Sequence, residues 1–219
     1  MIKKTLFAIA ALTLAVAANA ATTTVLTEGF NTTTDAAPVP TGWTQANVTT
    51  QGWFKDQGGN VVAQAGASDS FISANYLSAP FGGNFDLWLI TPELNLISGA
   101  SISFFSKTAE LGFQDGLEVL FSAGTSTALS SFTSLLTIGA GSLTTDWAQF
   151  TTTVADYSGA GRFAFRYAGT YDNSNYIGLD TVSVITTAAT TDVPEPASLA
   201  LMGLGVAGLV AARRKQQRA

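Results

Sequence analysis

Paired carboxylates are the catalytic apparatus that this sequence offers. The 219 residues contain no histidine and no cysteine, which excludes imidazole bases, thiolate nucleophiles, disulfides and zinc sites built from either residue. Two carboxylates can hydrolyse a glycosidic bond, and their separation sets the mechanism. The most tempting pair, Asp115 and Glu118, flanks one strand start and points to opposite faces. We therefore expect no catalytic residues, no enzyme activity and no organic cofactor; a polysaccharide-processing hydrolase is the least favoured alternative.

The carboxylates also give the central part of the chain a large negative charge. Residues 21–192 contain four basic side chains against 14 acidic ones, a net charge of −10. Such a surface disfavours nucleic acid as a partner. It favours a divalent cation, because clustered carboxylates without counter-charges are costly to bring together unless a metal lies between them.

The N-terminus is typical of a signal peptide. Lys3 and Lys4 precede an apolar run over residues 6–18, which is too short to span a bilayer stably. Small residues, Ala18 and Ala20, stand where a signal peptidase needs them. We expect cleavage after Ala20, so that the mature chain begins at Ala21.

A second apolar segment lies near the C-terminus. Residues 197–212 are uncharged and are followed by the basic residues Arg213, Arg214, Lys215 and Arg218. As a helix this segment would be about 24 Å long, shorter than the roughly 30 Å hydrocarbon core of a bilayer. It can span only with snorkelling arginines or a thinned bilayer. The basic tail predicts a cytoplasmic C-terminus in a single-pass intermediate.

The residues before this segment resemble a known sorting signal. Val193, Pro194, Glu195 and Pro196 stand directly before the apolar helix, and Arg213 and Arg214 follow it. This order and position resemble the PEP-CTERM signal of Gram-negative bacteria. The resemblance implies an exosortase-type processing enzyme as a partner and an organism that makes exopolysaccharide. It also implies a protein held transiently at the inner membrane, and then placed on the cell surface or released.

The region between the two apolar segments is predicted to be all-β. Ile102 and Phe104 alternate with Ser101 and Ser103, and similar alternation recurs in short runs separated by Gly, Ser, Asn and Asp. Threonine is abundant, which favours strands, and the number of runs suggests a sandwich of two antiparallel sheets. We divide the chain into a signal peptide (1–20), a β-sandwich domain (21–186), a linker with the Pro-Glu-Pro motif (187–196), a transmembrane sorting helix (197–212) and a basic cytoplasmic tail (213–219).

The order of motifs in this region resembles the choice-of-anchor J domain. The most specific segments are Trp-Leu-Ile-Thr-Pro at 88–92 and Gly-Leu-Asp-Thr-Val at 178–182. That group is similar to the cleaved adhesin domains of bacterial surface proteases and, more distantly, to MAM domains. The resemblance implies a jelly-roll β-sandwich, and a structural calcium ion that joins the first strand to the last through Glu28 and Asp180.

Asp180 also needs a partner on physical grounds. It lies in an apolar strand, between Leu179 and Val182, where an unpaired carboxylate would be expensive. Calcium is one answer; Arg162 or Arg166, or backbone N–H groups at a strand end, are the alternatives. Further candidate metal ligands are Asp69, Asp86, Asp172 and Asn175.

Aromatic residues indicate where a ligand would bind. Four tryptophans could stack on sugar rings, but core packing is the favoured role for Trp43, Trp53, Trp88 and Trp147. Five others lie among Gly, Asn and Ser in predicted loops and are better candidates for surface contacts: Tyr76, Phe81, Phe85, Tyr171 and Tyr176. We expect a cell-surface or matrix adhesion protein with exopolysaccharide, a surface glycan or a protein as partner; the alternative is a module that recognises one specific glycan.

Overall fold

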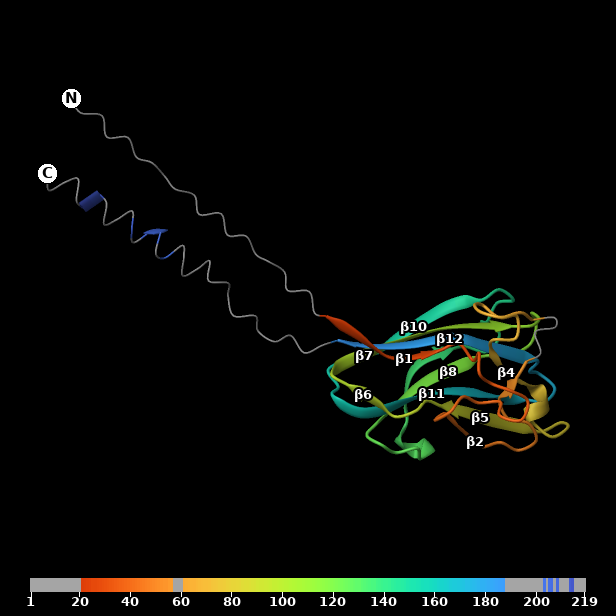
Figure 1. Cartoon of the computed structure of the whole chain (residues 1–219). Helices are drawn as coiled ribbons and strands as arrows, with labels where there is room; N and C mark the ends of the chain where they lie inside the picture. Colours follow the sequence, from red (N-terminus) through yellow and green to blue (C-terminus); the bar gives the residue numbers. More distant parts are fainter. Residues whose placement is uncertain are drawn as a thin grey trace, which may run out of the picture. The chain divides into compact units, whose positions relative to one another are not determined.

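The computed structural model describes residues 21–56 and 61–187, together with residues 203, 205, 206, 208, 213 and 214 (Figure 1). The chain divides into two units, residues 21–189 and the terminal segments 1–20 and 190–219. Several expected processing residues lie outside the described residues: Ala18, Ala20, Val193, Pro194, Glu195 and Pro196. Ala21 is exposed directly before the first strand, and Arg213 and Arg214 are helical and exposed. Among the described residues, no helix has the length and apolar character to cross a membrane.

The predicted all-β sandwich of two antiparallel sheets is confirmed. Sheet A has the order β10 (Ala148–Val154), β7 (Ser98–Thr108), β12 (Tyr176–Thr187), β4 (Ile72–Asn75) and β3 (Phe54–Lys55), with β1 (Thr22–Glu28) also paired to β12. Sheet B has the order β2 (Thr44–Ala46), β5 (Asn84–Ile90), β11 (Gly159–Thr170), β8 (Leu117–Ala123) and β9 (Thr133–Ile138), with β6 (Leu94–Leu96) also paired to β11. Two 3-10 turns, η1 (Tyr76–Ser78) and η2 (Leu129–Ser131), lie in the connections.

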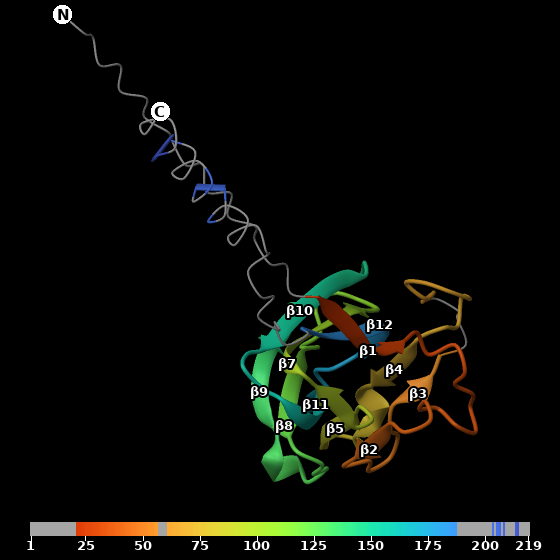
Figure 2. The ribbon, with the colours of Figure 1, turned by 60° about the vertical axis from the view of Figure 1, so that its left-hand side comes forward.

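The core forms where the apolar faces of the two sheets meet (Figure 2). Ile102 and Phe104 of β7 face inward and are fully buried, while Ser101 and Ser103 stay partly exposed, as the alternation predicted. Phe104 packs edge-on against Phe165 of β11, with ring centroids 5.0 Å apart. The two sheets are therefore held together by side chains at every second position of their strands.

Three tryptophans are buried, as expected for core residues. Trp43, Trp53 and Trp88 are each at most 5% exposed, and Trp43 stacks on Phe165 at 6.4 Å. Trp147 is partly exposed on the outer face of sheet A, where its indole N–H donates to the Val62 carbonyl at 2.9 Å. These contacts assign the tryptophans to packing.

The first and last strands lie side by side. β1 pairs antiparallel with the second half of β12, so that Thr22 lies opposite Thr187. The first and last strand residues of the sandwich domain therefore lie at the same end of the domain (Figure 1). β12 has 12 residues and runs for about 36 Å at roughly 3.3 Å per residue. The loops between β4 and β5 and between β11 and β12 therefore lie at the opposite end, which we call the tip.

Candidate functional site

Three of the five candidate aromatics gather at the tip. The ring of Tyr171 packs edge-on against Tyr76 of η1, at 5.1 Å between centroids, and against Phe81, at 5.2 Å. Phe81 is 88% exposed and follows Pro80 in a turn closed by the Gly83 N–H donating to the Pro80 carbonyl at 2.8 Å. We call Tyr76, Phe81 and Tyr171 the aromatic tip cluster.

The aromatic tip cluster is held by backbone and capping contacts between its loops. The Tyr171 N–H donates to the Gly83 carbonyl at 2.9 Å, which joins the two loops. The Asn75 side chain caps η1 by accepting from the Leu77 N–H at 3.0 Å. The exposed ring of Phe81 therefore stands on a supported turn, which limits the conformational entropy lost when a partner binds.

The other two candidate aromatics are buried, contrary to the expectation that they contact a ligand. Phe85 is 4% exposed and packs on Tyr167 at 4.6 Å, because its position in β5 faces inward. Tyr176 is 9% exposed, and its hydroxyl binds Ser73 and, at 2.7 Å, Asp56. Burial raises the pKa of the Tyr176 hydroxyl, and Asp56 adds to that rise.

Asp115 holds the end of the β11–β12 loop by hydrogen bonds to Asn175 and Tyr176. Its carboxylate is 1% exposed. One oxygen accepts from the Tyr167 hydroxyl at 2.6 Å and the Asn175 N–H at 2.9 Å; the other accepts from the Thr108 hydroxyl at 3.0 Å and the Tyr176 N–H at 3.2 Å. The loop between β11 and β12, which carries Tyr171, is thus fixed at its end by a buried carboxylate. Burial raises the pKa of the Tyr167 hydroxyl, and the charge of Asp115 adds to it.

Asp115 and Glu118 bind different partners. Glu118 accepts from Arg166 at 3.0 Å, and Asp86 accepts from the same guanidinium at 2.6 Å. The guanidinium lies 5.4 Å from the centre of the Trp88 ring. Asp115 is 1% exposed and binds the tip loop, whereas Glu118 binds Arg166, so the Asp115 carboxylate is not accessible as one of the two groups that glycoside hydrolysis requires.

Asp180 is satisfied by three backbone N–H groups and the Thr181 hydroxyl. Its side chain is fully buried; one oxygen accepts from the N–H groups of Gln64 at 2.8 Å and Ala65 at 3.2 Å, and the other from the N–H and hydroxyl of Thr181. Thr181 has φ 50° at a register shift of β12, a rare conformation for a β-branched residue. Burial raises the pKa of Asp180, and the backbone N–H groups partly offset that rise.

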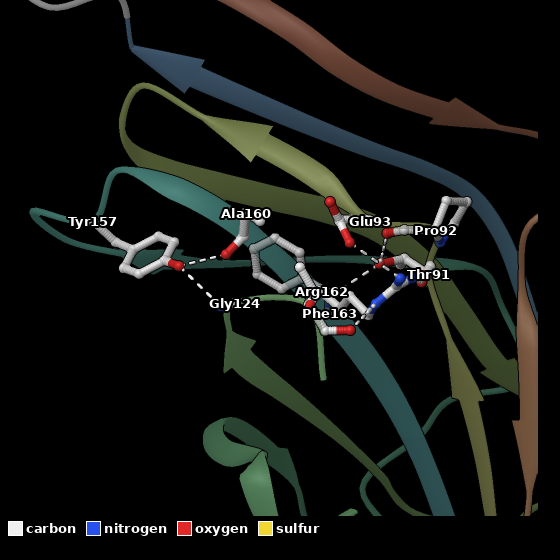
Figure 3. Close-up of polar contacts among 9 residues, drawn as sticks. Thr91, Pro92, Glu93, Gly124, Tyr157, Ala160, Arg162 and Phe163 are labelled. Carbon is white, nitrogen blue, oxygen red and sulfur yellow. Dashed lines mark hydrogen bonds and ion pairs between the residues drawn. The ribbon is translucent and has the colours of Figure 1, made fainter. Parts of the chain in front are cut away.

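The two arginines that could have neutralised Asp180 bind elsewhere. Figure 3 shows Arg162 donating to the Thr91 carbonyl at 3.1 Å and to Glu93 at 3.4 Å. The buried Thr91 hydroxyl accepts from the Phe163 N–H at 3.0 Å, so the Trp-Leu-Ile-Thr-Pro segment locks β5 to β11. Figure 3 also shows the Tyr157 hydroxyl, which accepts from the Gly124 N–H and donates to the Ala160 carbonyl.

The calcium hypothesis at Glu28 and Asp180 stays a prediction. β1 pairing sets Glu28 opposite Val182, two residues beyond Asp180, and burial raises the pKa of both carboxyls. Two acids on neighbouring strands fit a bridging cation. However, an ion that contacts Asp180 would have to share oxygens that already accept four hydrogen bonds. The remaining candidates are dispersed: Asp69 pairs with Lys55, Asp172 is exposed, and the Asn175 N–H donates to Asp115; no three acidic side chains cluster within the described part of the chain.

A melting experiment tests the calcium hypothesis. We expect calcium to raise the melting temperature of residues 21–189, because an ion that binds only the folded state stabilises it by about 2.7 kcal/mol at a hundredfold excess over its Kd. That corresponds to roughly 5–10 °C for a domain of this size. The shift should vanish in Glu28→Gln and Asp180→Asn. Superimposed curves with calcium and with chelator would mean that protein donors alone satisfy Asp180.

Two shallow hollows on the described surface lie outside the aromatic tip cluster. The larger, about 300 Å³, is lined by residues including Asp35, Gln45 and Trp53. The smaller, about 170 Å³, lies beside Glu118 and Arg166. Neither is lined by a member of the aromatic tip cluster. Because small-molecule sites are concave, the protruding cluster is better suited to a polymer or a broad surface.

Comparisons with known proteins agree with this organisation. Residues 192–215 match the PEP-CTERM protein-sorting motif. Solved structures that share the fold include the K3 and K1 cleaved adhesin domains of Lys-gingipain from Porphyromonas gingivalis W83, and the K2 cleaved adhesin domain of Lys-gingipain. Their identities are 23%, 22% and 21%, with TM-scores of 0.56, 0.56 and 0.57. The alignments cover 76%, 75% and 75% of this chain and 99%, 97% and 99% of those domains. No curated protein matches the chain.

These findings define the class of protein. The chain carries a PEP-CTERM sorting motif behind a β-sandwich that is similar in fold to cleaved adhesin domains. The sorting motif and the sandwich were both expected from the sequence.

Proposed function

We propose that this protein is an exported adhesion protein that binds a cell-surface or matrix polymer through the aromatic tip cluster. The observation that carries the proposal is Phe81, which is 88% exposed on a closed turn and stands beside Tyr171 and Tyr76. Large aromatic rings contribute much of the energy at interfaces. Tyr76 and Tyr171 are partly exposed and Leu77 is exposed, so Phe81 belongs to a contiguous apolar surface, and such surfaces mark interaction sites.

The position of the cluster supports an adhesive role. The first and last strand residues of the sandwich domain, Thr22 and Thr187, lie opposite each other at the end of the domain away from the tip. A sorting signal that attaches the C-terminal segment to a membrane or surface would therefore leave the tip free to meet a partner. Processing by an exosortase-type enzyme and association with exopolysaccharide, and through it with a biofilm, are the parts of this proposal that rest on the PEP-CTERM motif.

A module that recognises one specific glycan is the second candidate. The observation that favours it is the mixture of rings and amides at the tip. Asn84 and Asn173 are exposed next to the loops that carry Phe81 and Tyr171. Aromatic faces pack on the C–H faces of sugars, and amide groups both donate to and accept from sugar hydroxyls. We expect neither candidate to involve catalysis.

Binding by the aromatic tip cluster is tested with residues 21–189 on a glycan array and on exopolysaccharide-coated plates. We expect Phe81→Ala to weaken binding by about 30-fold, the loss typical of an interface hot spot of about 2 kcal/mol, with an unchanged melting temperature because Phe81 is exposed. Ile97→Ala is the matched control, because Ile97 is a 40% exposed apolar residue in the β6–β7 connection, at the opposite end.

The outcomes separate the candidates. Binding to one glycan structure supports the specific module, whereas binding to many matrix polymers supports general adhesion. If Phe81→Ala and Tyr171→Ala bind as tightly as the unchanged domain, the aromatic tip cluster is not the contact site and the proposal fails.

A further inference from the structure

Strand β10 leaves a long edge of sheet A open. In residues 21–56 and 61–187, β10 pairs with β7 alone, and its seven residues run in unbroken register from Ala148 opposite Ser106 to Val154 opposite Ala100. Figure 2 shows β10 at the margin of its sheet. The outer side of such a strand presents backbone N–H and C=O groups that another strand can pair with.

The other sheet edges in the described residues carry features that hinder pairing. β9 has a bulge at Leu135, whose carbonyl accepts from Thr152 of β10 at 3.4 Å. β1 is interrupted between Thr24 and Leu26. β2, β3 and β6 have only three, two and three residues. Natural proteins protect edges with bulges, short strands, prolines and charges, and β10 has none of these between Ala148 and Val154.

We propose that β10 pairs antiparallel with β10 of a second copy of this chain, about a two-fold axis at Thr151. Thr151 is the midpoint of β10, so this register overlaps all seven residues. It sets Thr151 opposite its own counterpart and Gln149 opposite Thr153. Each of these cross-strand pairs is uncharged, and pairs of threonines stabilise neighbouring strands. The pairing joins two six-stranded sheets into one continuous sheet with closed two-fold symmetry.

The charge distribution makes repulsion between two copies weakest at this edge and makes the pairing depend on salt. Residues 21–192 have a net charge of −10, so copies repel each other over most surfaces, whereas β10 itself is uncharged. The flanking acids, Asp146 and Asp156, are exposed and lie five residues on either side of Thr151. The proposed register therefore sets Asp146 of one copy beside Asp156 of the other.

Salt screens this repulsion. The Debye length falls from about 30 Å at 0.01 M salt to about 8 Å at 0.15 M. The dimer therefore forms at moderate and high ionic strength and dissociates at low ionic strength. Because Ala148 lies toward the tip and Val154 toward the other end of sheet A, the antiparallel pairing directs the two tips to opposite ends of the dimer, so that one dimer can join two partners. The pairing itself does not depend on what the tip binds.

Sedimentation equilibrium of residues 21–189, a compact unit with its own core, tests the proposal. We expect a monomer in about 0.01 M sodium chloride and a doubling of the mass at about 0.15 M and above. Thr151→Lys sets two ammonium groups opposite each other at the axis, and we expect it to raise the dimer Kd by about fivefold or more. Thr153→Lys, opposite Gln149 at the same edge, tests the same pairing if Thr151→Lys fails to fold.

The control variant distinguishes this pairing from general association. Thr24→Lys makes the same charge change at an exposed threonine of β1 in the same sheet. Each lysine lowers the net negative charge, so general association would strengthen in both variants. We expect Thr24→Lys to dimerise at least as well as the unchanged domain, and Asp146→Asn with Asp156→Asn to allow dimers at lower salt. A monomer at every salt concentration, or a dimer that Thr151→Lys does not weaken, overturns the proposal.

Discussion

Asp115→Ala is expected to lower the free energy of unfolding by about 3–5 kcal/mol, because it leaves several buried donors without an acceptor. The carboxylate accepts from the hydroxyls of Thr108 and Tyr167 and from the N–H groups of Asn175 and Tyr176. Because Asp115 is only 1% exposed, water has little access to replace its carboxylate. The free energy of unfolding of an ordinary domain is about 5–15 kcal/mol, so the substitution removes a large part of it.

Urea titration of Asp115→Ala against Asp172→Ala measures this effect. Asp172 is an exposed acid in the β11–β12 loop, which Asp115 holds, and its removal should change stability by less than about 0.5 kcal/mol. The loop that carries Tyr171 should also loosen in Asp115→Ala, so we expect faster amide exchange at Asn175 and Tyr176. A loss below about 1 kcal/mol would mean that water replaces the carboxylate.

The sequence predicted the sandwich because its strongest signal is local. Burial alternates with period two along β7, and a strand of that kind can be recognised from Ile102 and Phe104 alone. The order in which the strands pair cannot be recognised in this way. β12 lies between β7 on one side and both β4 and β1 on the other, and these partners come from distant parts of the chain. No local pattern specifies which strands meet, so the register could not be predicted.

The same limit explains which of the candidate aromatics lie at the surface and which are buried. Phe81 and Phe85 are both surrounded by Gly and Asn, but Phe81 lies in a turn and Phe85 is the second residue of β5. Tyr176 is the first residue of β12, directly after Asn175. A shift of one or two residues in a strand boundary therefore moves a ring from the surface to the core. Composition predicts loops well, but it locates their ends poorly.

Long-range partners of the buried acids could not be predicted either. The need of Asp180 for a partner was visible from its apolar neighbours, but the donors at Gln64 and Ala65 come from a segment more than 100 residues away. In the sequence, Asp115 stood out only as one of two acids whose spacing argues against a catalytic pair. Its role in holding the tip loop became visible only when Tyr167, Asn175 and Tyr176 were placed around it.

Stability is expected to fall by about 3 kcal/mol between pH 9 and pH 11, because two buried tyrosines keep their protons only while the chain is folded. Burial raises the pKa of Tyr167 and Tyr176 above the ordinary value of 10.0. Above that value the unfolded chain releases both protons while the folded chain retains them. The folded state then binds more protons, so stability is fully present below pH 10 and is lost as the pH rises.

The free energy of unfolding, measured by urea titration at pH 9, 10 and 11, tests this assignment. Each tyrosine contributes about 1.4 kcal/mol at one pH unit above its unfolded pKa, so Tyr167→Phe and Tyr176→Phe should each halve the loss, and the double variant should remove most of it. Changes are compared within each variant, because both substitutions also remove hydrogen bonds, to Asp115 and to Asp56. If Tyr167→Phe/Tyr176→Phe loses as much stability as the unchanged domain, other groups cause the alkaline unfolding, and the two hydroxyls are not the proton sites that couple folding to pH.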